Sequence, residues 1–162
     1  MPDLKIIDDL HSPSDTIKVT FRGQNPAAVI GMIPEILKNT MKISTKDLIE
    51  NDMRWDQLGS ENGFYGVWMG KRREDKWSLT KIRVLVQGEQ TISEKVGKFD
   101  LQVKGVLETE YGYNHSFQRM FWLFFNRHFY NNQRRKYIDE GRYDMDTIKE
   151  EIMSRFKILQ GD

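Results

Sequence analysis

The sequence contains no cysteine and no long apolar run. Without cysteine the chain has no disulfide, no thiolate ligand for zinc and no cysteine nucleophile, and this composition suits a reducing compartment. The longest apolar run, 120–125, has six residues, whereas a transmembrane helix needs about 20. The first residues do not have the pattern of a secretory signal. We therefore expect a cytoplasmic protein with no transmembrane segment.

Known catalytic and cofactor motifs are also missing. The spacings of a P-loop, a dinucleotide-binding glycine loop, a zinc-hydrolase helix and a serine-hydrolase turn do not occur. The three histidines, His11, His115 and His128, do not have the spacing of metal ligands. We predict no metal and no cofactor, and we favour a non-enzymatic role while leaving an enzymatic one open.

Neither sign of charge dominates the composition. The chain has 25 basic and 24 acidic residues, so only a local patch can attract nucleic acid or a membrane. Its 162 residues, 12% of them aromatic, are enough to build one hydrophobic core. We predict a flexible N-terminal tail over residues 1–15 and a single α+β domain over 16–162.

Hydrophobic periodicity gives the order of the first elements. Residues 16–22 alternate between apolar and polar side chains, which predicts a half-buried strand. Asn25 and Pro26 are suited to begin a helix, and apolar residues follow at helical spacing as far as Met41. Pro34 lies inside this pattern and is expected to kink the helix or split it in two.

Four further segments predict strands. Segments 47–57, 63–72, 76–88 and 96–110 are rich in aromatic and β-branched residues and are separated by short turn sequences. Connections this short join antiparallel neighbours. A glycine inside the last segment, Gly105, marks a candidate bend. The segments predict a curved antiparallel sheet.

The remaining sequence is helical in pattern. Ser116 can cap a helix whose first half, 117–129, is apolar nearly all round, which is typical of a helix buried on several sides. Gly141 predicts a break, after which an extra terminal helix over 144–160 presents an apolar stripe. This stripe consists of Met145, Ile148, Ile152, Phe156 and Leu159. It packs either on its own sheet or on a second copy, so the oligomeric state stays open.

Residues 111–138 form a basic aromatic segment without a single Asp or Glu. Its cations are Arg119, Arg127, Arg134, Arg135 and Lys136. Three interpretations are open: a nucleic-acid surface, a helix lying in a membrane interface, or a core helix with a basic edge. We favour burial of 117–129. That leaves Arg134, Arg135 and Lys136 as a surface patch for nucleic acid or an acidic protein.

Two groups of side chains are candidates for acid–base chemistry. Asp52 and Asp56 project from one face of a predicted strand with Arg54 between them, an arrangement that also fits a solvated ion-pair face. His128 lies beside the apolar face of the predicted helix and is either a general base or a hydrogen-bonded core residue. For both groups we favour the structural role.

The order strand, helix, antiparallel strands, long C-terminal helix resembles the helix-grip fold of the START and Bet v 1-like superfamily. The resemblance is one of topology over residues 16–140, with about five predicted strands where that superfamily has six or seven. It implies an apolar pocket between the sheet and the helix at 117–137, and hence a binding domain for an apolar small molecule or lipid. The implied lining residues are Phe99, Leu101, Val103, Ile82, Val84, Phe121, Phe125 and His128.

Overall fold

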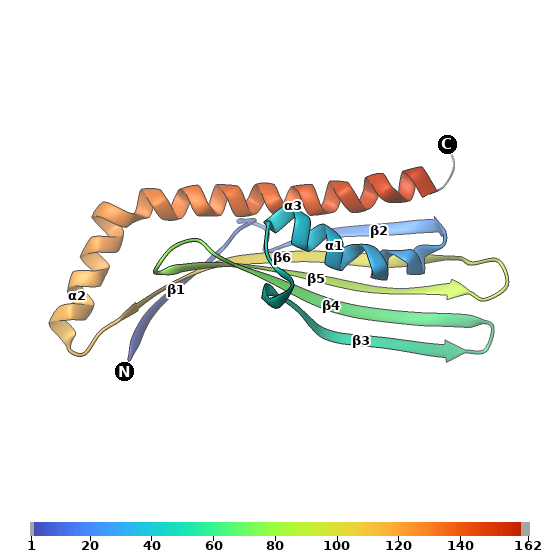
Figure 1. Cartoon of the computed structure of the whole chain (residues 1–162), viewed down its shortest axis with the longest axis horizontal. Coiled ribbons are helices and arrows are strands. Elements are labelled where there is room, and N and C mark those ends of the chain that lie inside the picture. The colour runs from blue at the N-terminus through green and yellow to red at the C-terminus, as the bar shows by residue number, and fades with distance from the viewer. Residues whose placement is uncertain (1, 160–162) are drawn as a thin grey trace.

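A computed structural model describes residues 2–159 and shows an α+β fold built on one antiparallel sheet (Figure 1). The strand order is β1-β6-β5-β4-β3, and β2 also pairs with β6. This confirms the predicted fold class. The six strands are β1 (Asp3–Asp9), β2 (Thr16–Gln24), β3 (Leu48–Leu58), β4 (Glu61–Arg73), β5 (Ser78–Thr91) and β6 (Val96–Gly112).

Two helices pack against one face of this sheet, and a third lies at one end of it (Figure 1). A short 3-10 turn, η1 (Pro26–Ala28), leads into α1 (Val29–Met41), and a second, η2 (Thr45–Asp47), leads into β3. The C-terminal helical region comprises α2 (Ser116–Phe125), a π-helical turn η3 (Asn126–Tyr130) and the long helix α3 (Asn131–Leu159). Within residues 2–159, no helix is long and apolar enough to cross a membrane.

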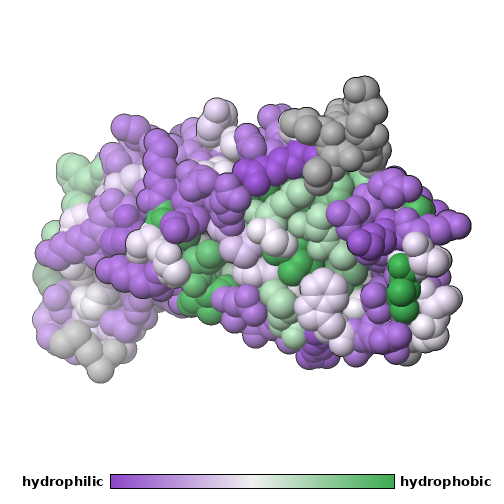
Figure 2. Space-filling view, turned by 45° about the vertical axis from the view of Figure 1, so that its right-hand side comes forward, coloured by the Kyte–Doolittle hydropathy of each residue, from purple (hydrophilic) through white to green (hydrophobic). Residues whose placement is uncertain are grey.

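The core lies between the inner face of the sheet and the helices α1 and α3. Alternation along β5 and β6 turns every second side chain inward, as the strand pattern requires. Phe156 of α3 contacts Phe21 and Phe99, with ring centroids 4.6 and 5.1 Å apart. Figure 2 shows polar residues over most of one face of the molecule, with apolar residues gathered near its middle.

The prediction of a flexible tail over residues 1–15 is wrong, because Asp3–Asp9 forms β1. β1 and β2 pair with successive halves of the same edge of β6, at residues 106–112 and 96–104. Between them Leu10 is fully buried, and its N–H donates to the Gly105 carbonyl at 3.0 Å. This strand raises the five predicted strands to six.

The break predicted at Gly141 is wrong, since α3 runs through this residue, and Pro34 does not split α1 in two. Strand β6 likewise continues through Gly105. A Cβ atom at either glycine would lie 2.6 Å from Leu10 Cδ1. The two glycines therefore make room for Leu10 where α3 crosses β6, and residues 144–159 continue α3. The side chain of Leu159 and residues 160–162 lie outside the described part. In α1, burial of the apolar face outweighs the one hydrogen bond that Pro34 removes.

Candidate functional site

Helix α2 begins with a reciprocal cap that differs from the predicted one. His115, not Ser116, occupies the N-cap, and its Nδ1 accepts a hydrogen bond from the Gln118 N–H at 3.3 Å. The Gln118 side chain in turn accepts from the Asn114 N–H at 2.8 Å. This exchange satisfies free N–H groups at the helix start in the manner of a capping box.

A change of direction follows α2. Residues 126–130 form a π-helical turn, and π turns are a common cause of sharp helix kinks. Figure 1 shows α2 at a steep angle to α3, at the end of the sheet where β1 begins and β6 ends. The kink therefore places α2 beyond the main core instead of across the sheet.

One side of α2 is held by an aromatic anchor. Trp122 stacks on Tyr111 of β6 with ring centroids 4.7 Å apart and planes at 8°. The Trp122 indole N–H donates to the Gly112 carbonyl at 2.9 Å, and the Tyr111 hydroxyl donates to Asn126 at 3.1 Å. The rings of the aromatic anchor are those of Trp77, Tyr111, Trp122, Phe125 and Tyr130.

Asp75, in the turn between β4 and β5, connects this anchor to the start of α3. One carboxylate oxygen accepts hydrogen bonds from the hydroxyls of Tyr130 and Tyr137. The other accepts from the backbone N–H groups of Trp77 and Ser78, at 2.8 and 2.9 Å. Burial acts to raise the pKa of Asp75, but these hydrogen bonds outweigh it and lower the pKa below its ordinary value. The ionised carboxylate thus fixes the turn and both tyrosines together.

The opposite side of α2 is open to solvent, which contradicts the predicted burial of 117–129. Six large apolar side chains of this stretch are between 40% and 78% exposed. They form the α2 surface: Phe117, Met120, Phe121, Leu123, Phe124 and Phe129. Burial was expected because the helix is apolar nearly all round, yet only the side bearing Trp122 and Phe125 meets the body.

The cations of the basic aromatic segment divide into two groups. Arg119 and Arg127 are exposed on α2 and η3, and Arg135 and Lys136 are exposed at the start of α3. Arg134, predicted to belong to a surface patch, is buried; it forms an ion pair with Asp8 and donates to Thr109 at 3.0 Å. The predicted patch thus loses one of its three members.

The structure does not bring together the eight residues predicted to line a pocket. Those from β5 and β6 are buried in the core under α3, whereas those from the helical region lie at the far end of the sheet. The buried residues are Phe99, Leu101, Val103, Ile82 and Val84, and the distant ones are Phe121, Phe125 and His128. Phe99 meets Phe156 of α3, so side chains fill the space beside it.

The candidate acid–base residues also stand apart. Asp52 and Arg54 form an ion pair of 2.9 Å on the outer face of β3, Arg54 lies over the Tyr65 ring, and Asp56 is exposed. His128 is exposed, with its ring 4.5 Å from that of Phe124. This arrangement fits the ion-pair interpretation of the strand, and it places His128 among the side chains around the α2 surface.

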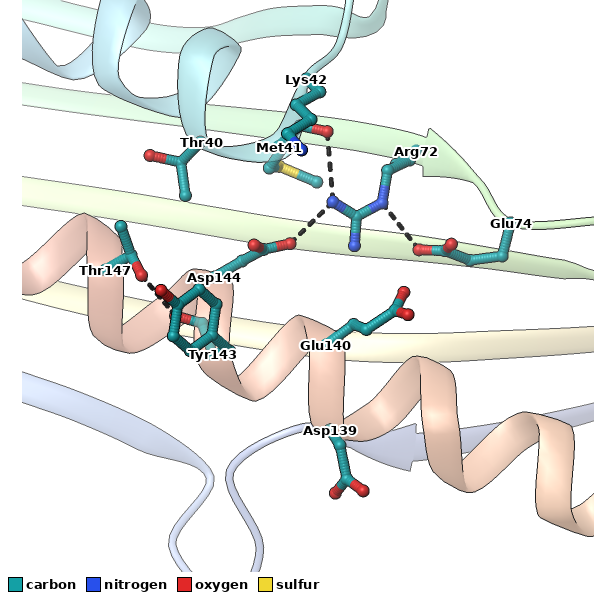
Figure 3. Close-up of a pocket in the computed structure, with 10 residues that line it drawn as sticks. All are labelled: Thr40, Met41, Lys42, Arg72, Glu74, Asp139, Glu140, Tyr143, Asp144 and Thr147. Carbon is teal, nitrogen blue, oxygen red and sulfur yellow. Dashed lines mark hydrogen bonds and ion pairs between the residues drawn. The ribbon is translucent and has the colours of Figure 1, made fainter.

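A groove of about 670 Å³ lies between the end of α1 and the middle of α3 (Figure 3). Arg72 crosses it: Nε donates to Glu74 at 2.8 Å, and Nη1 donates to Asp144 at 2.7 Å and to the Met41 carbonyl at 3.1 Å. These bonds tie β4, α1 and α3 together and satisfy a carbonyl at the end of α1. The Arg72 guanidinium is thus paired with Glu74 and Asp144, while its Nη2 is buried without a hydrogen-bond partner in the described part of the chain. These ion pairs give Arg72 a structural role.

Comparison with known proteins adds no relative from which function can be transferred. No protein-family description and no curated protein matches the sequence. Among solved structures, an uncharacterized protein from Rhizobium leguminosarum is 8% identical at a TM-score of 0.22, over 93% of this chain and 99% of that one. A protein of unknown function from Staphylococcus aureus is 7% identical at a TM-score of 0.24, over 91% and 99%. Scores this low carry no argument about fold or function.

Proposed function

We propose that the protein is a peripheral interaction module that binds the interface of an anionic lipid membrane through the α2 surface. The observation that carries this proposal is the exposure of six large apolar side chains on α2 and the adjoining π turn, while the other side of α2 is anchored to the sheet. Contiguous apolar patches on soluble proteins mark interaction sites, whereas isolated apolar residues need no explanation. The α2 surface is of the first kind.

The width of the α2 surface favours a lipid bilayer as its binding partner over a narrow groove on another protein. At about 100° per residue, the exposed side chains from Phe117 to Phe124 cover an arc of roughly 160°. A helix that packs on one flat partner needs an apolar stripe of only about 100°. Acyl chains at a bilayer interface can surround the wider arc, and aromatic and leucine side chains suit that depth.

The charges near the α2 surface select an anionic occupant. Arg119 and Arg127 are exposed beside the apolar side chains, and residues 111–138 contain no carboxylate to neutralise them. In a symmetric dimer through α2 the same cations would face each other, so self-association is disfavoured. A nucleic acid would match the charge but would leave most of the apolar area without an apolar partner. An anionic bilayer satisfies both requirements.

Vesicle co-sedimentation tests the proposal. Two arginines near a charged surface contribute about 1 kcal/mol each, so we expect roughly 30-fold tighter binding to phosphatidylcholine–phosphatidylglycerol vesicles than to phosphatidylcholine alone. Replacing Phe121 and Phe124 together by serine removes two exposed phenyl rings and should weaken binding by about 2 kcal/mol, again roughly 30-fold. Both side chains are more than half exposed, so the variant should retain its stability.

A matched control removes apolar side chains elsewhere. Ile49 and Trp55 are exposed on β3, far along the chain from α2. The double variant Ile49→Ser and Trp55→Ser should bind vesicles like the unmodified protein. Equal weakening in both double variants, or equal binding to neutral and anionic vesicles, contradicts the assignment of α2 as an anionic-lipid surface.

A second candidate function, the binding of an apolar small molecule, follows from the helix-grip resemblance. A curved antiparallel sheet with a long C-terminal helix packed against it supports this candidate. The ligand would need α3 to move away from the sheet, since Phe99 and Phe156 are in contact. Native mass spectrometry followed by organic extraction tests it: a co-purifying apolar compound is expected, and its absence from protein purified without detergent argues against it.

A further inference from the structure

We infer that the outer face of the sheet is a second interaction surface, independent of α2, that binds the phosphate backbone of a nucleic acid. Both packed helices, α1 and α3, contact the inner face. Among residues 2–159, no helix covers the opposite face of β4, β5 and β6. The basic sheet surface on that face consists of Lys18, Lys71, Lys81, Arg83 and Lys104.

The register of the strands places like charges directly opposite one another. Lys71 of β4 is paired with Lys81 of β5, and Arg83 of β5 is paired with Lys104 of β6. Opposed like charges destabilise a sheet, whereas opposite charges in the same positions would stabilise it. At the pair of Arg83 and Lys104, the folding of the sheet alone therefore gives no reason for this arrangement, and a bound anion would relieve it.

Intramolecular carboxylates compensate these cations only in part. The Glu108 carboxylate forms an ion pair with the Lys81 ammonium at 2.9 Å. The Asp15 carboxylate lies 3.9 Å from the Lys104 ammonium, at the limit of an ion pair. Among the described side chains, none forms an ion pair with Lys71 or Arg83. A shallow hollow of about 260 Å³ lies between the two pairs; it is lined by Met69, Lys81, Arg83, Lys104, Val106 and Glu108.

The chemistry of this face fits a nucleic acid better than a protein or a bilayer. Lysine is depleted at protein–protein interfaces, whereas protein–nucleic acid interfaces are polar and strongly positive. The apolar side chains between the cations, such as Met69, Leu85 and Val106, are partly buried, so this face has no protruding apolar group to insert among acyl chains. Gln87 and Gln102 add exposed amides that can donate to phosphate oxygens. Few aromatic rings are present, so backbone contacts predominate.

The dimensions of the face allow a strand of nucleic acid to lie along it. β5 has 14 residues, which at about 3.3 Å per residue extends roughly 45 Å. Four phosphates neutralised by the basic sheet surface would give a salt slope of about −3 for a single strand and somewhat steeper for a duplex. We therefore expect sequence-independent binding that weakens strongly with salt.

Two readouts on one variant test the inference. Anisotropy of labelled mixed-sequence single-stranded and duplex oligonucleotides is measured at low and moderate salt. Replacing Arg83 and Lys104 together by glutamine should weaken binding at least 10-fold and make the salt slope shallower by about 1.4 to 1.8. The same change removes one opposed pair, so the melting temperature of the free protein at low salt should rise by about 1–3 °C.

Control variants separate this surface from α2 and from bulk charge. Lys46→Gln with Lys149→Gln removes the same net charge from exposed positions on the helical side and should leave oligonucleotide binding unchanged. Arg119→Gln with Arg127→Gln removes the cations beside the α2 surface. This variant should bind anionic vesicles more weakly and oligonucleotides as tightly as the unmodified protein. The inference is overturned by no oligonucleotide binding at low salt, or by equal weakening in the Lys46/Lys149 control. It is also overturned if the α2 variant loses oligonucleotide binding, or if the Arg83/Lys104 variant loses vesicle binding and keeps oligonucleotide binding.

Discussion

Replacement of Gly141 by alanine should destabilise the protein, although alanine is the better helix former. In a solvent-exposed helix this substitution gains about 1 kcal/mol. Here the new Cβ would lie 2.6 Å from Leu10 Cδ1 and 2.9 Å from Leu10 Cδ2, and Leu10 is fully buried. Overpacking of this kind costs about 1–3 kcal/mol. The net expectation is a loss of about 1 kcal/mol, or about 2–4 °C in melting temperature.

The same substitution should have the opposite sign once Leu10 is shortened. Leu10→Ala alone costs about 2–5 kcal/mol because it leaves a cavity where α3 crosses β6. In that background the three atoms nearest to a Cβ at position 141, all from the Leu10 side chain, are gone, and Gly141→Ala should stabilise by up to about 1 kcal/mol. Urea unfolding followed by circular dichroism gives all four free energies of unfolding. Stabilisation by Gly141→Ala in both backgrounds would refute the crossing of α3 over Leu10.

Three further predictions concern the anchoring of α2 and of β1. Asp75→Asn should lower stability at neutral pH and make the further loss of stability in acid smaller. The reason is that a carboxyl with a lowered pKa stabilises the fold above its unfolded pKa of about 3.9, and this stabilisation is lost as the pH falls. Urea midpoints at neutral pH and near pH 3 check this, and an equal drop in midpoint for the variant and the unmodified protein would contradict it. Arg134→Met should lower the free energy of unfolding by about 2–3 kcal/mol, less than the ~3–5 kcal/mol of a fully buried pair, because Asp8 is partly exposed. In thermal unfolding, Asp8→Ala should show a similar loss, and the double variant should lose less than the sum of the two single variants. Trp122→Ala should speed amide hydrogen exchange across 116–130 while leaving the protection of β5 unchanged; equal acceleration in β5 would show that the aromatic anchor belongs to the main core.

Local patterns were sufficient to predict most of the sheet. The four segments from 47 to 110 match β3 to β6 closely, because alternation and short turns act within a few residues. β1 was missed because Asp3, Asp8 and Asp9 make it polar, and its pairing partner lies about a hundred residues away in β6. The break predicted at Gly141 is wrong for a similar reason: glycine is a poor helix former, but Gly141 faces Leu10, a contact that no local pattern reveals. Gly105 of β6 faces the same side chain.

The candidate site was harder to predict than the fold. A helix that is apolar nearly all round is normally buried, so the stretch from Phe117 to Phe129 was assigned to the core. Its exposure depends on the π turn at 126–130, which directs α2 away from the sheet, and a π turn has no clear sequence signal. The absence of carboxylates from residues 111–138 was a usable signal, since a core helix has no need to exclude acids from its polar edge.

The most direct test of the central claim follows the α2 surface itself into a membrane. The chain has no cysteine, so Phe121→Cys and Trp55→Cys each provide one site for an environment-sensitive fluorophore. With anionic vesicles, the label at 121 should brighten, shift to shorter wavelength and be quenched by spin-labelled acyl chains, whereas the label at 55 should not change. A label at 121 that stays accessible to an aqueous quencher while the protein is bound to vesicles would contradict the proposed function.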